Sequence, residues 1–306
     1  MEHIGKVTMN YDYYSGKDLY SDGDIEDTLL EIVKNHDKSE FPEIIAEKKS
    51  WPVLYHLSDV RTNILNWYPF KKDANVLEVG AGCGAITGTL ADKTARVTAV
   101  DLSKRRSLIN AYRNKDKENL EIIVGNFYDI SSAMKERYDY VTLIGVLEYG
   151  ECYIPGENAY QAFLEKIKGL LKPDGKVLIA IENQLGLKYF AGCKEDHVGR
   201  YFEGIEGYTN TSGVRTFSKK ALADLLTQSG YEGLEFYYPY PDYKLPDTIY
   251  TDDFLPAKGE LCRNSRNFDA DRMALFNETK AWNTIIEAGL FPEFSNSFFI
   301  VATKKG

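Results

Sequence analysis

Three glycines at alternate positions, Gly80, Gly82 and Gly84, follow a short apolar segment and come just before a predicted helix. Glycine lets a backbone turn tightly and approach a ligand closely, and the start of a helix offers unpaired N–H groups. Asp101 ends the next apolar segment, about twenty residues further on, where a carboxylate can accept hydrogen bonds from two ribose hydroxyls. The segment from Asn75 to Asp101 therefore predicts a site for a nucleoside cofactor.

The glycine spacing alone does not identify this cofactor, because Gly80 to Ala85 also satisfies the fingerprint of dinucleotide-binding folds. Glu78 stands two residues before the first glycine. Its carboxylate attracts the ammonium group of an amino acid and repels a pyrophosphate. The shortness of the predicted helix Ala85 to Ala91 also favours S-adenosylmethionine over a dinucleotide. We therefore expect S-adenosylmethionine, and a nucleotide-linked oxidoreductase is the rival interpretation.

Transfer of a methyl group from a sulfonium needs alignment of the acceptor and exclusion of water, and it needs a general base only if the acceptor is a hydroxyl. His197 is the candidate base, because its segment leaves the carboxyl end of a predicted strand. An exposed loop histidine is the alternative. Glu148 stands at the tip of another strand, where it would orient a ligand or pair with a helix N-terminus.

Three further residues are candidates for binding the acceptor. Arg200 and Glu206 share the segment of His197, and an ordered surface loop without a ligand is the alternative for each. Tyr14, with the neighbouring tyrosines 11, 13 and 20, predicts an aromatic lid near the sulfonium, and simple packing of the arm is the alternative. Cys83 lies inside the glycine-rich loop, where a small apolar residue serves equally well, so we expect no reactive thiol.

Strand and helix alternate strictly after residue 75, and the strands are short and nearly all apolar. This pattern predicts an α/β fold with a Rossmann-like, doubly wound, mostly parallel sheet covered on both faces. Two interruptions, at about 184–216 and 241–294, predict insertions that cover the substrate side of this 75–306 core. Residues 1–74 predict a helical N-terminal arm or lid, with helices at Asp24–Val33 and Ser58–Trp67.

The motif ExGxGxG at Glu78 to Gly84, together with Asp101, Gly125-Asn126 and the segment from Gly145 to Tyr149, resembles the class I methyltransferases. The resemblance covers roughly residues 75–240 and the last strand. It implies a seven-stranded sheet whose last strand inserts antiparallel to its neighbour. The cofactor-binding residues that it implies are Glu78, Gly80, Ala81, Gly82, Cys83, Gly84, Asp101, Leu102, Asn126, Phe127, Ile144, Gly145 and Val146. Many members have Asp where this chain has Asn126, so the contact with adenine differs.

Several longer stretches, among them YHLSDVRTNILNWYPF, LIGVLEY and FYYPYPDYKLP, are similar to methyltransferase domains of bacterial surface-glycan gene clusters, some of which are joined to glycosyltransferases. This similarity implies a small-molecule or glycan acceptor, a role in polysaccharide biosynthesis and a possible glycosyltransferase partner. O-methylation is the expected reaction. N-methylation of a small molecule, or a module that binds the cofactor without turnover and positions partner enzymes, are the alternatives.

Composition excludes several other classes of protein. The formal charge of -9, without a basic cluster, argues against nucleic acid as a partner. The four cysteines lie far apart and form no CxxC pair, so we expect neither a metal centre nor a disulfide framework. No apolar run reaches about eighteen residues and the N-terminus lacks a basic start, so we expect a cytoplasmic protein with no membrane span.

Overall fold

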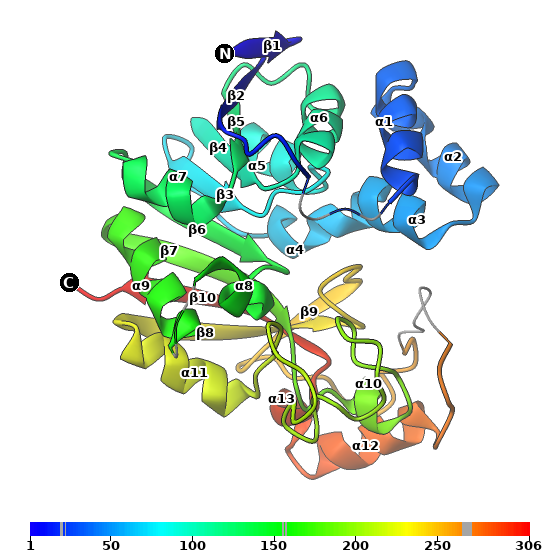
Figure 1. The fold of residues 1–306 in the computed structure, drawn as a ribbon. Helices are drawn as coiled ribbons and strands as arrows, with labels where there is room; N and C mark the ends of the chain where they lie inside the picture. The colour runs from blue at the N-terminus through cyan, green and yellow to red at the C-terminus, as the bar shows by residue number, and fades with distance from the viewer. Residues whose placement is uncertain (19–20, 22, 155, 157, 265–270) are drawn as a thin grey trace. The chain divides into compact units, whose positions relative to one another are not determined.

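The protein was analysed as a computed structural model, which describes all residues except 19–20, 22, 155, 157 and 265–270 (Figure 1). Two compact units share the chain. Unit 1 contains Met1–Leu143, Gly169–Val177 and Gly306, and unit 2 contains Ile144–Lys168 and Leu178–Lys305. One strand, β7 (Leu171–Glu182), begins in unit 1 and ends in unit 2.

Unit 1 is built on a parallel sheet. Its strands lie in the order β1 (Glu2–Ile4), β2 (Val7–Tyr13), β5 (Leu120–Gly125), β4 (Arg96–Asp101), β3 (Asn75–Val79), β6 (Tyr138–Ile144) and the first part of β7. The pairs β2–β5, β5–β4, β4–β3 and β3–β6 are parallel, whereas β1–β2 is antiparallel. The central strands are apolar and buried, as predicted for a sheet covered on both faces.

Seven α-helices accompany this sheet in the part of unit 1 that is described. They are α1 (Ile25–Asn35), α2 (Phe41–Lys48), α3 (Trp51–Leu57), α4 (Asn63–Asn66), α5 (Thr87–Lys93), α6 (Lys104–Arg113) and α7 (Phe127–Ala133). Figure 1 shows α1, α2 and α3 grouped beside α6. Apolar residues of α1, α2 and α3, such as Leu29, Phe41 and Val53, form one buried cluster with Ile109 of α6.

The predicted helix at Asp24–Val33 is confirmed as α1. The predicted helix at Ser58–Trp67 is divided into a 3-10 turn, Asp59–Thr62, and the short α4. Ser58 caps this segment as its sequence suggests, since its side chain accepts a hydrogen bond from the backbone N–H of Val60.

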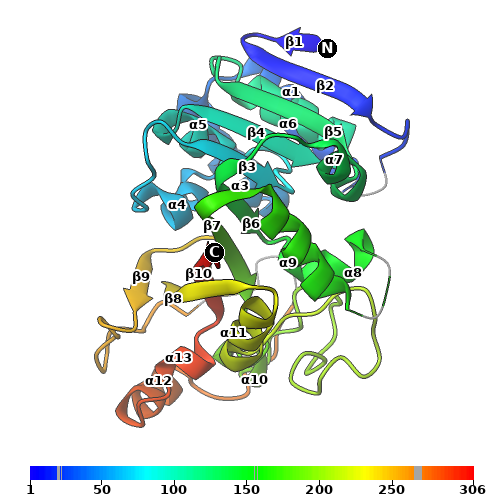
Figure 2. The same ribbon diagram turned by 90° about the vertical axis from the view of Figure 1, so that its left-hand side faces the viewer.

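The prediction of a purely helical N-terminal arm is wrong for residues 2–13, which form β1 and β2. Figure 2 shows these strands continuing the sheet beyond β5. Residues 7–13 form a strand because buried Val7 and Met9 alternate with more exposed residues, a period of two that is typical of a strand. The helical character begins at Ile25.

Unit 2 carries the second part of β7 followed by β10 (Ser297–Lys304), β8 (Tyr231–Tyr240) and β9 (Thr248–Thr251), in that order across the sheet. β10 pairs antiparallel with β8, and β8 pairs antiparallel with β9. The last strand of the chain therefore lies between β7 and β8, which confirms the predicted inserted antiparallel strand. The predicted count of seven strands is wrong, because β1, β2 and β9 bring the total among the described residues to ten.

The remaining elements of unit 2 are mostly short helices. They are a 3-10 turn at Leu147–Tyr149, α8 (Gly150–Tyr153), α9 (Ala159–Leu170), α10 (Leu187–Phe190), α11 (Lys219–Gln228), α12 (Glu278–Glu287) and α13 (Phe291–Phe294). The first predicted insertion contains α10 and otherwise irregular backbone, and the second contains β9, α12 and α13. The division into a 1–74 arm and a 75–306 core stays a prediction.

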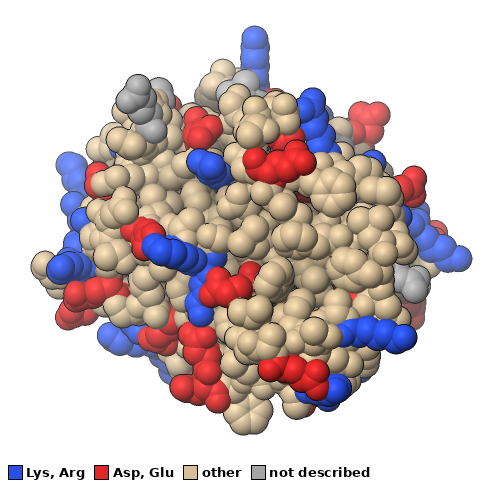
Figure 3. Space-filling view, turned by 90° about the horizontal axis from the view of Figure 1, so that it is seen from below, with Lys and Arg blue, Asp and Glu red and all other residues tan. Residues whose placement is uncertain are grey.

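Charged side chains of both signs are interspersed on the face drawn in Figure 3, and its Lys and Arg residues lie apart, most of them near acidic ones. Uncharged residues occupy most of the middle of this face. Among the described residues, no helix is both long and apolar enough to cross a membrane.

Candidate functional site

The glycine-rich loop of unit 1 leaves the carboxyl end of β3 and turns back against β4. The backbone N–H groups of Gly80 and Ala81 both donate to the carbonyl oxygen of Val100, at 2.8 and 3.1 Å. Gly82 and Gly84 have φ angles of +52° and +74°, which L side chains rarely adopt. The loop is thus held by β4 in a conformation that its glycines permit.

Gly82 and Gly84 require the absence of a side chain for different reasons. A Cβ atom on Gly84 would lie 2.3 Å from Oδ1 and 3.0 Å from the Cα atom of Asn110 in α6, so this residue allows the loop to pack against the helix. A Cβ on Gly82 would meet nothing closer than a guanidinium nitrogen of Arg106 at 4.0 Å. The backbone of Gly82 therefore borders open space, where a ligand can approach it.

Asp101, the last residue of β4, joins the loop to the segment that follows it. Its Oδ2 accepts the N–H of Gly82 at 2.7 Å, and its Oδ1 accepts the N–H of Ser103 at 2.9 Å. Burial raises the pKa of this carboxyl group, and the charge of Arg106 and the two N–H donors oppose the rise. Each oxygen keeps a second lone pair for a further donor such as a ribose hydroxyl.

Glu78 lies in β3, just before the loop, and its carboxylate lacks a hydrogen-bonding partner. It is buried in β3, and neither of its carboxylate oxygens has a partner at hydrogen-bonding geometry among the described residues. Burial raises its pKa to about 8, the Thr87 hydroxyl opposes the rise, and the charge of Asp101 adds to it. A buried carboxylate without a partner is costly, so the site suits a ligand that brings a positive charge. The ammonium group of S-adenosylmethionine fits it, and a pyrophosphate does not.

The other predicted cofactor residues of unit 1 lie on the same elements. Cys83 is buried and packs in the apolar cluster of α1, α2, α3 and α6, so its thiol has a packing role as predicted. Leu102 follows directly after Asp101 and is half-buried. Asn126 caps α7, because its side-chain oxygen accepts the N–H of Tyr128 at 2.9 Å, and Phe127 beside it is buried.

In unit 2, the residues after β6 lead to a buried cluster of charged side chains. Ile144 and Val146 flank Gly145, whose N–H donates to the carbonyl oxygen of Ala180 in β7 at 2.9 Å. A Cβ on Gly145 would lie 2.8 Å from the hydroxyl of Tyr243 and 3.5 Å from Oε1 of Glu148. Residues 144–146 therefore border this cluster, and their contact with the cofactor stays a prediction.

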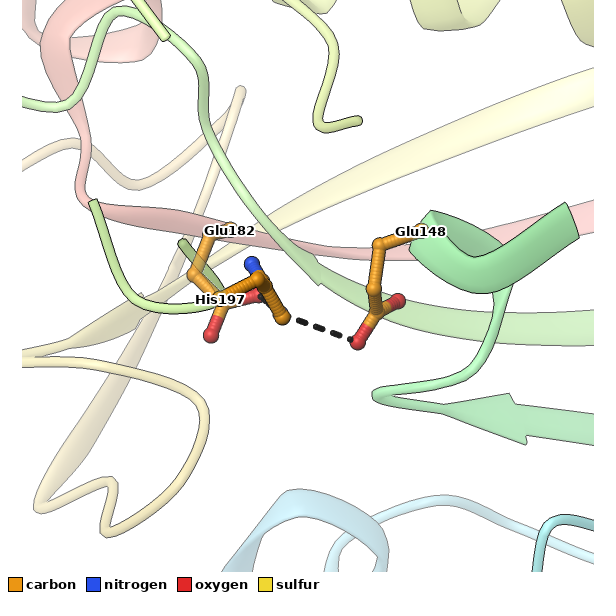
Figure 4. A group of neighbouring side chains, drawn as sticks. All are labelled: Glu148, Glu182 and His197. Atoms are coloured by element: carbon orange, nitrogen blue, oxygen red, sulfur yellow. Dashed lines mark ion pairs between the residues drawn. The ribbon is translucent and has the colours of Figure 1, made fainter. Parts of the chain in front are cut away.

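His197 lies in the cluster with three carboxylates and is not an exposed loop residue. Its Nδ1 lies 3.0 Å from Oε1 of Glu195, and its Nε2 lies 3.5 Å from Oε1 of Glu148 and 3.7 Å from Oε2 of Glu182 (Figure 4). All four side chains are at least nine-tenths buried. The sequence-based alternative of a solvent-exposed histidine is thus wrong, because the first insertion folds back onto the ends of β6 and β7.

Charge dominates the ionisation of this cluster. Burial alone would lower the pKa of His197, but Glu182, Glu148 and Glu195 outweigh it and hold that pKa well above its ordinary value. Burial raises the pKa of Glu148. For Glu182, burial is outweighed by Lys244 and His197, which lower the pKa. The carboxylates therefore favour the protonated form of His197, which opposes a role for its neutral imidazole as a base.

A second layer of charges surrounds these residues. Nζ of Lys244 lies 2.7 Å from Oε1 of Glu182 and also contacts Asp196. Nζ of Lys188, which is fully buried, lies 2.9 Å from Asp196 and 2.8 Å from Asp242. None of these residues is singled out by the sequence alone. A signal for one of them existed, since Glu182 is the last residue of β7, and carboxyl ends of parallel strands are where ligands gather.

The remaining candidates lie outside this cluster. Tyr14 belongs to unit 1, where its hydroxyl donates to Asp18 at 3.2 Å, and Asp18 in turn accepts the N–H groups of Lys104 and Arg105 at the start of α6. Arg200 and Glu206 are exposed on the first insertion. Tyr20 lies outside the described residues. The roles of Tyr14, Arg200 and Glu206 in binding an acceptor stay predictions.

Comparison with known proteins agrees with this arrangement. Residues 53–235 match a family described as a methyltransferase domain. An uncharacterized methyltransferase of Staphylococcus carnosus is 30% identical over 155 residues, which are 51% of this chain and 67% of that protein. A ubiquinone biosynthesis O-methyltransferase of Coxiella burnetii is 28% identical over 160 residues, which are 49% of this chain and 64% of that protein. The chain thus spans less than two thirds of the Coxiella relative.

A solved structure shows the same fold. The crystal structure of a SAM-dependent methyltransferase from Archaeoglobus fulgidus superposes with a TM-score of 0.51, covering 83% of this chain and 100% of that one at 14% identity. The methyltransferase fold and family expected from the sequence are confirmed, whereas the similarity to glycan gene clusters stays a prediction. With more than half of its length matched, the chain belongs to the methyltransferase-domain family.

Proposed function

We propose that the protein transfers a methyl group from S-adenosylmethionine to an oxygen atom of a small or glycan-like acceptor. The observation that carries the proposal is the pair of buried carboxylates beside an open glycine backbone. Glu78 lacks a hydrogen-bonding partner, and Asp101 holds the N–H of Gly82 while keeping lone pairs for a ribose. An ammonium group and a diol, both present in S-adenosylmethionine, satisfy these two needs together.

Bound S-adenosylmethionine supplies a methyl group on an already activated sulfonium, so the protein has three tasks. It must hold the acceptor in line with the methyl group, exclude water and take up the proton that a hydroxyl acceptor loses. The carbon–sulfur bond breaks, the electron pair stays on sulfur, and the new bond joins carbon to the acceptor oxygen.

We propose that Glu148 takes up this proton. Its pKa is raised by burial, and its Oε2 is buried without a hydrogen-bonding partner, so that oxygen is available as an acceptor. His197 contacts the other oxygen, Oε1, and positions the carboxylate. The role of His197 itself as the base stays a prediction that its raised pKa opposes.

An oxygen acceptor is favoured by the name of the Coxiella relative, which is an O-methyltransferase. The glycan-like class of acceptor, the glycosyltransferase partner, the role in polysaccharide biosynthesis and the cytoplasmic location rest on the sequence alone. N-methylation and cofactor binding without turnover are the competing functions.

The test uses purified protein incubated with S-adenosylmethionine labelled in its methyl group and a fractionated metabolite and glycan extract. We expect a labelled product, formation of S-adenosylhomocysteine, and release of the label only under conditions that cleave an ether or ester. Glu148→Gln should lower turnover at least tenfold and leave cofactor affinity within about twofold. Absence of cofactor binding by calorimetry would refute the proposal, and binding without turnover on any fraction would favour the cofactor-binding module.

A further inference from the structure

We propose that Glu148, Glu182 and His197 bind one divalent transition-metal ion, a site that the cysteine-based reading of the sequence did not predict. One ligand atom from each residue lies within 4.8 Å of the others, and the three side chains come from the 3-10 turn Leu147–Tyr149, the end of β7 and the first insertion (Figure 4). The proposal rests on unit 2 alone, so it does not depend on the proposed methyl transfer.

The distances in the cluster suit ligands of a shared ion better than direct hydrogen bonds. Nε2 of His197 lies 3.5 Å from Glu148 and 3.7 Å from Glu182. Hydrogen bonds between charged nitrogen and oxygen are about 2.7–2.9 Å long. Two ligands that each lie about 2.1 Å from a tetrahedral ion are separated by about 3.4 Å. The gap between the imidazole and the carboxylates therefore matches the separation of neighbouring ligands.

The other nitrogen of His197 is held as it would be in a metal site. Nδ1 lies 3.0 Å from Oε1 of Glu195. Glu195 is itself fixed, because its Oε2 accepts the N–H groups of His197 and Val198 at 2.7 and 2.8 Å, and its Oε1 accepts the hydroxyl of Tyr208 at 3.0 Å. Metal-ligating histidines commonly donate their second N–H to such a carboxylate, which directs the free nitrogen at the ion.

Unpartnered buried oxygens and the balance of charge give independent support. Oε2 of Glu148 and Oε2 of Glu182 are buried without a hydrogen-bonding partner in the described chain, whereas Oε1 of Glu182 lies 2.7 Å from Nζ of Lys244. Glu148 and Glu182 are 1% and 0% exposed. Five carboxylates with buried side chains face two lysines and one imidazole in this region, an excess of negative charge that favours a divalent cation.

The chemistry of the ligands selects the kind of ion. Two carboxylates and one imidazole are hard to borderline ligands that suit Mn²⁺, Fe²⁺ or Zn²⁺ and leave coordination positions open. Gly145 borders the site, since a Cβ there would lie 3.5 Å from Oε1 of Glu148. A hydroxyl bound to a divalent cation loses its proton more readily. If Glu148 binds the ion through Oε1, its Oε2 remains able to take up that proton.

The experiment uses the full chain without an affinity tag, stripped of metal by a chelator, and titrated with Mn²⁺. Loss of the free Mn²⁺ signal in electron paramagnetic resonance should show one bound ion per chain. Calorimetry in buffers of different ionisation enthalpy should show release of about one proton, because His197 must be neutral to bind. Glu182→Gln should weaken binding at least tenfold. Glu165→Gln, which removes an exposed carboxylate of α9, is the matched control and should bind as wild type does.

Equal affinities of the Glu182→Gln and Glu165→Gln variants would overturn the proposal, since any bound ion would then lie elsewhere. Wild-type protein that binds neither Mn²⁺ nor Zn²⁺ at concentrations on the order of 1 mM would also overturn it. Circular dichroism reports whether Glu182→Gln folds. If Glu182→Gln does not fold, the ¹⁵N resonances of the four imidazoles in wild-type protein test the proposal instead. Zn²⁺ should shift the Nε2 resonance of His197, and an unshifted resonance would overturn the proposal. None of these readouts needs methyl transfer, so they fail or succeed separately from the proposed function.

Discussion

Binding of S-adenosylmethionine should strengthen steeply as pH rises, because Glu78 must lose a proton to receive the ammonium group. In the free protein burial raises the pKa of Glu78 to about 8, so the carboxyl group is mostly protonated at neutral pH. An ammonium group beside it favours the ionised form. The bound state therefore holds one proton fewer than the free state between the two pKa values, and affinity must rise with pH over that window.

The size of the effect follows from the same pKa. At pH 6 about one molecule in a hundred has Glu78 ionised, and at pH 9 about nine in ten have it ionised. The dissociation constant should thus fall roughly 90-fold between pH 6 and pH 9, with a slope of about tenfold per pH unit below pH 7 and a plateau above pH 9. Glu78→Gln has no such proton to lose, so its affinity should be weak and nearly constant over this range.

Isothermal titration calorimetry at pH 6, 7, 8 and 9 measures both quantities. The matched control is Glu43→Gln, which changes an exposed residue of α2 in the same unit and should reproduce the wild-type slope. The reasoning would be refuted if wild-type protein and Glu78→Gln showed the same dependence on pH, because the titrating group would then be a different one, such as the amino group of the ligand.

Four further outcomes follow from the structure. Asp101→Asn turns one of its two N–H acceptors into a donor, a loss of about 1.5–3 kcal/mol, so calorimetry should show cofactor affinity at least tenfold lower; a change under twofold contradicts this. Gly84→Ala should lower the free energy of unfolding, measured in urea titrations, by about 2 kcal/mol or more because its Cβ would collide with Asn110. The control Gly169→Ala should leave the free energy of unfolding unchanged, because a Cβ there meets no atom within 4 Å. Glu78 has a higher pKa in the folded than in the unfolded chain, so the free energy of unfolding should fall as pH rises between about 5 and 8. The expected slope is roughly 1.4 kcal/mol per pH unit, and Glu78→Gln should remove it. Lys188→Met leaves the buried Asp242 without its cation, while Asp196 keeps Lys244, and should lower the free energy of unfolding by about 3 kcal/mol. The change is measured as a lowered Tm, and an unchanged Tm would contradict it.

The cofactor loop could be predicted from the sequence because its chemistry is local. The glycines, Glu78 and Asp101 lie within two strands and the turn between them, so their spacing fixes which groups can meet. The alternation of apolar strands and helices likewise predicts the parallel sheet, because it is carried by neighbouring residues. The inserted last strand was implied only by the resemblance to class I methyltransferases.

The parts that sequence did not predict depend on contacts between distant segments. His197 was singled out by residue type, but its burial among Glu148, Glu182 and Glu195 arises only when the first insertion folds back onto two strand ends. Lys244 comes from the second insertion, and no periodicity links it to Glu182. The electrostatics that set the pKa of His197 therefore could not be read from spacing.

The position of β2 has a consequence for how the chain folds. Thr8 and Met9 pair in parallel with Glu121 and Ile122, so this pairing can form only after β5, more than a hundred residues further along the chain, has been synthesised. During synthesis β2 leaves the ribosome long before its partner, and its apolar residues stay exposed to chaperones and to other chains for that interval. Such a long-range closure slows folding and makes the early chain sensitive to crowding. Late docking of β2 is thus expected to set the pace of productive folding, and with it the yield of native protein.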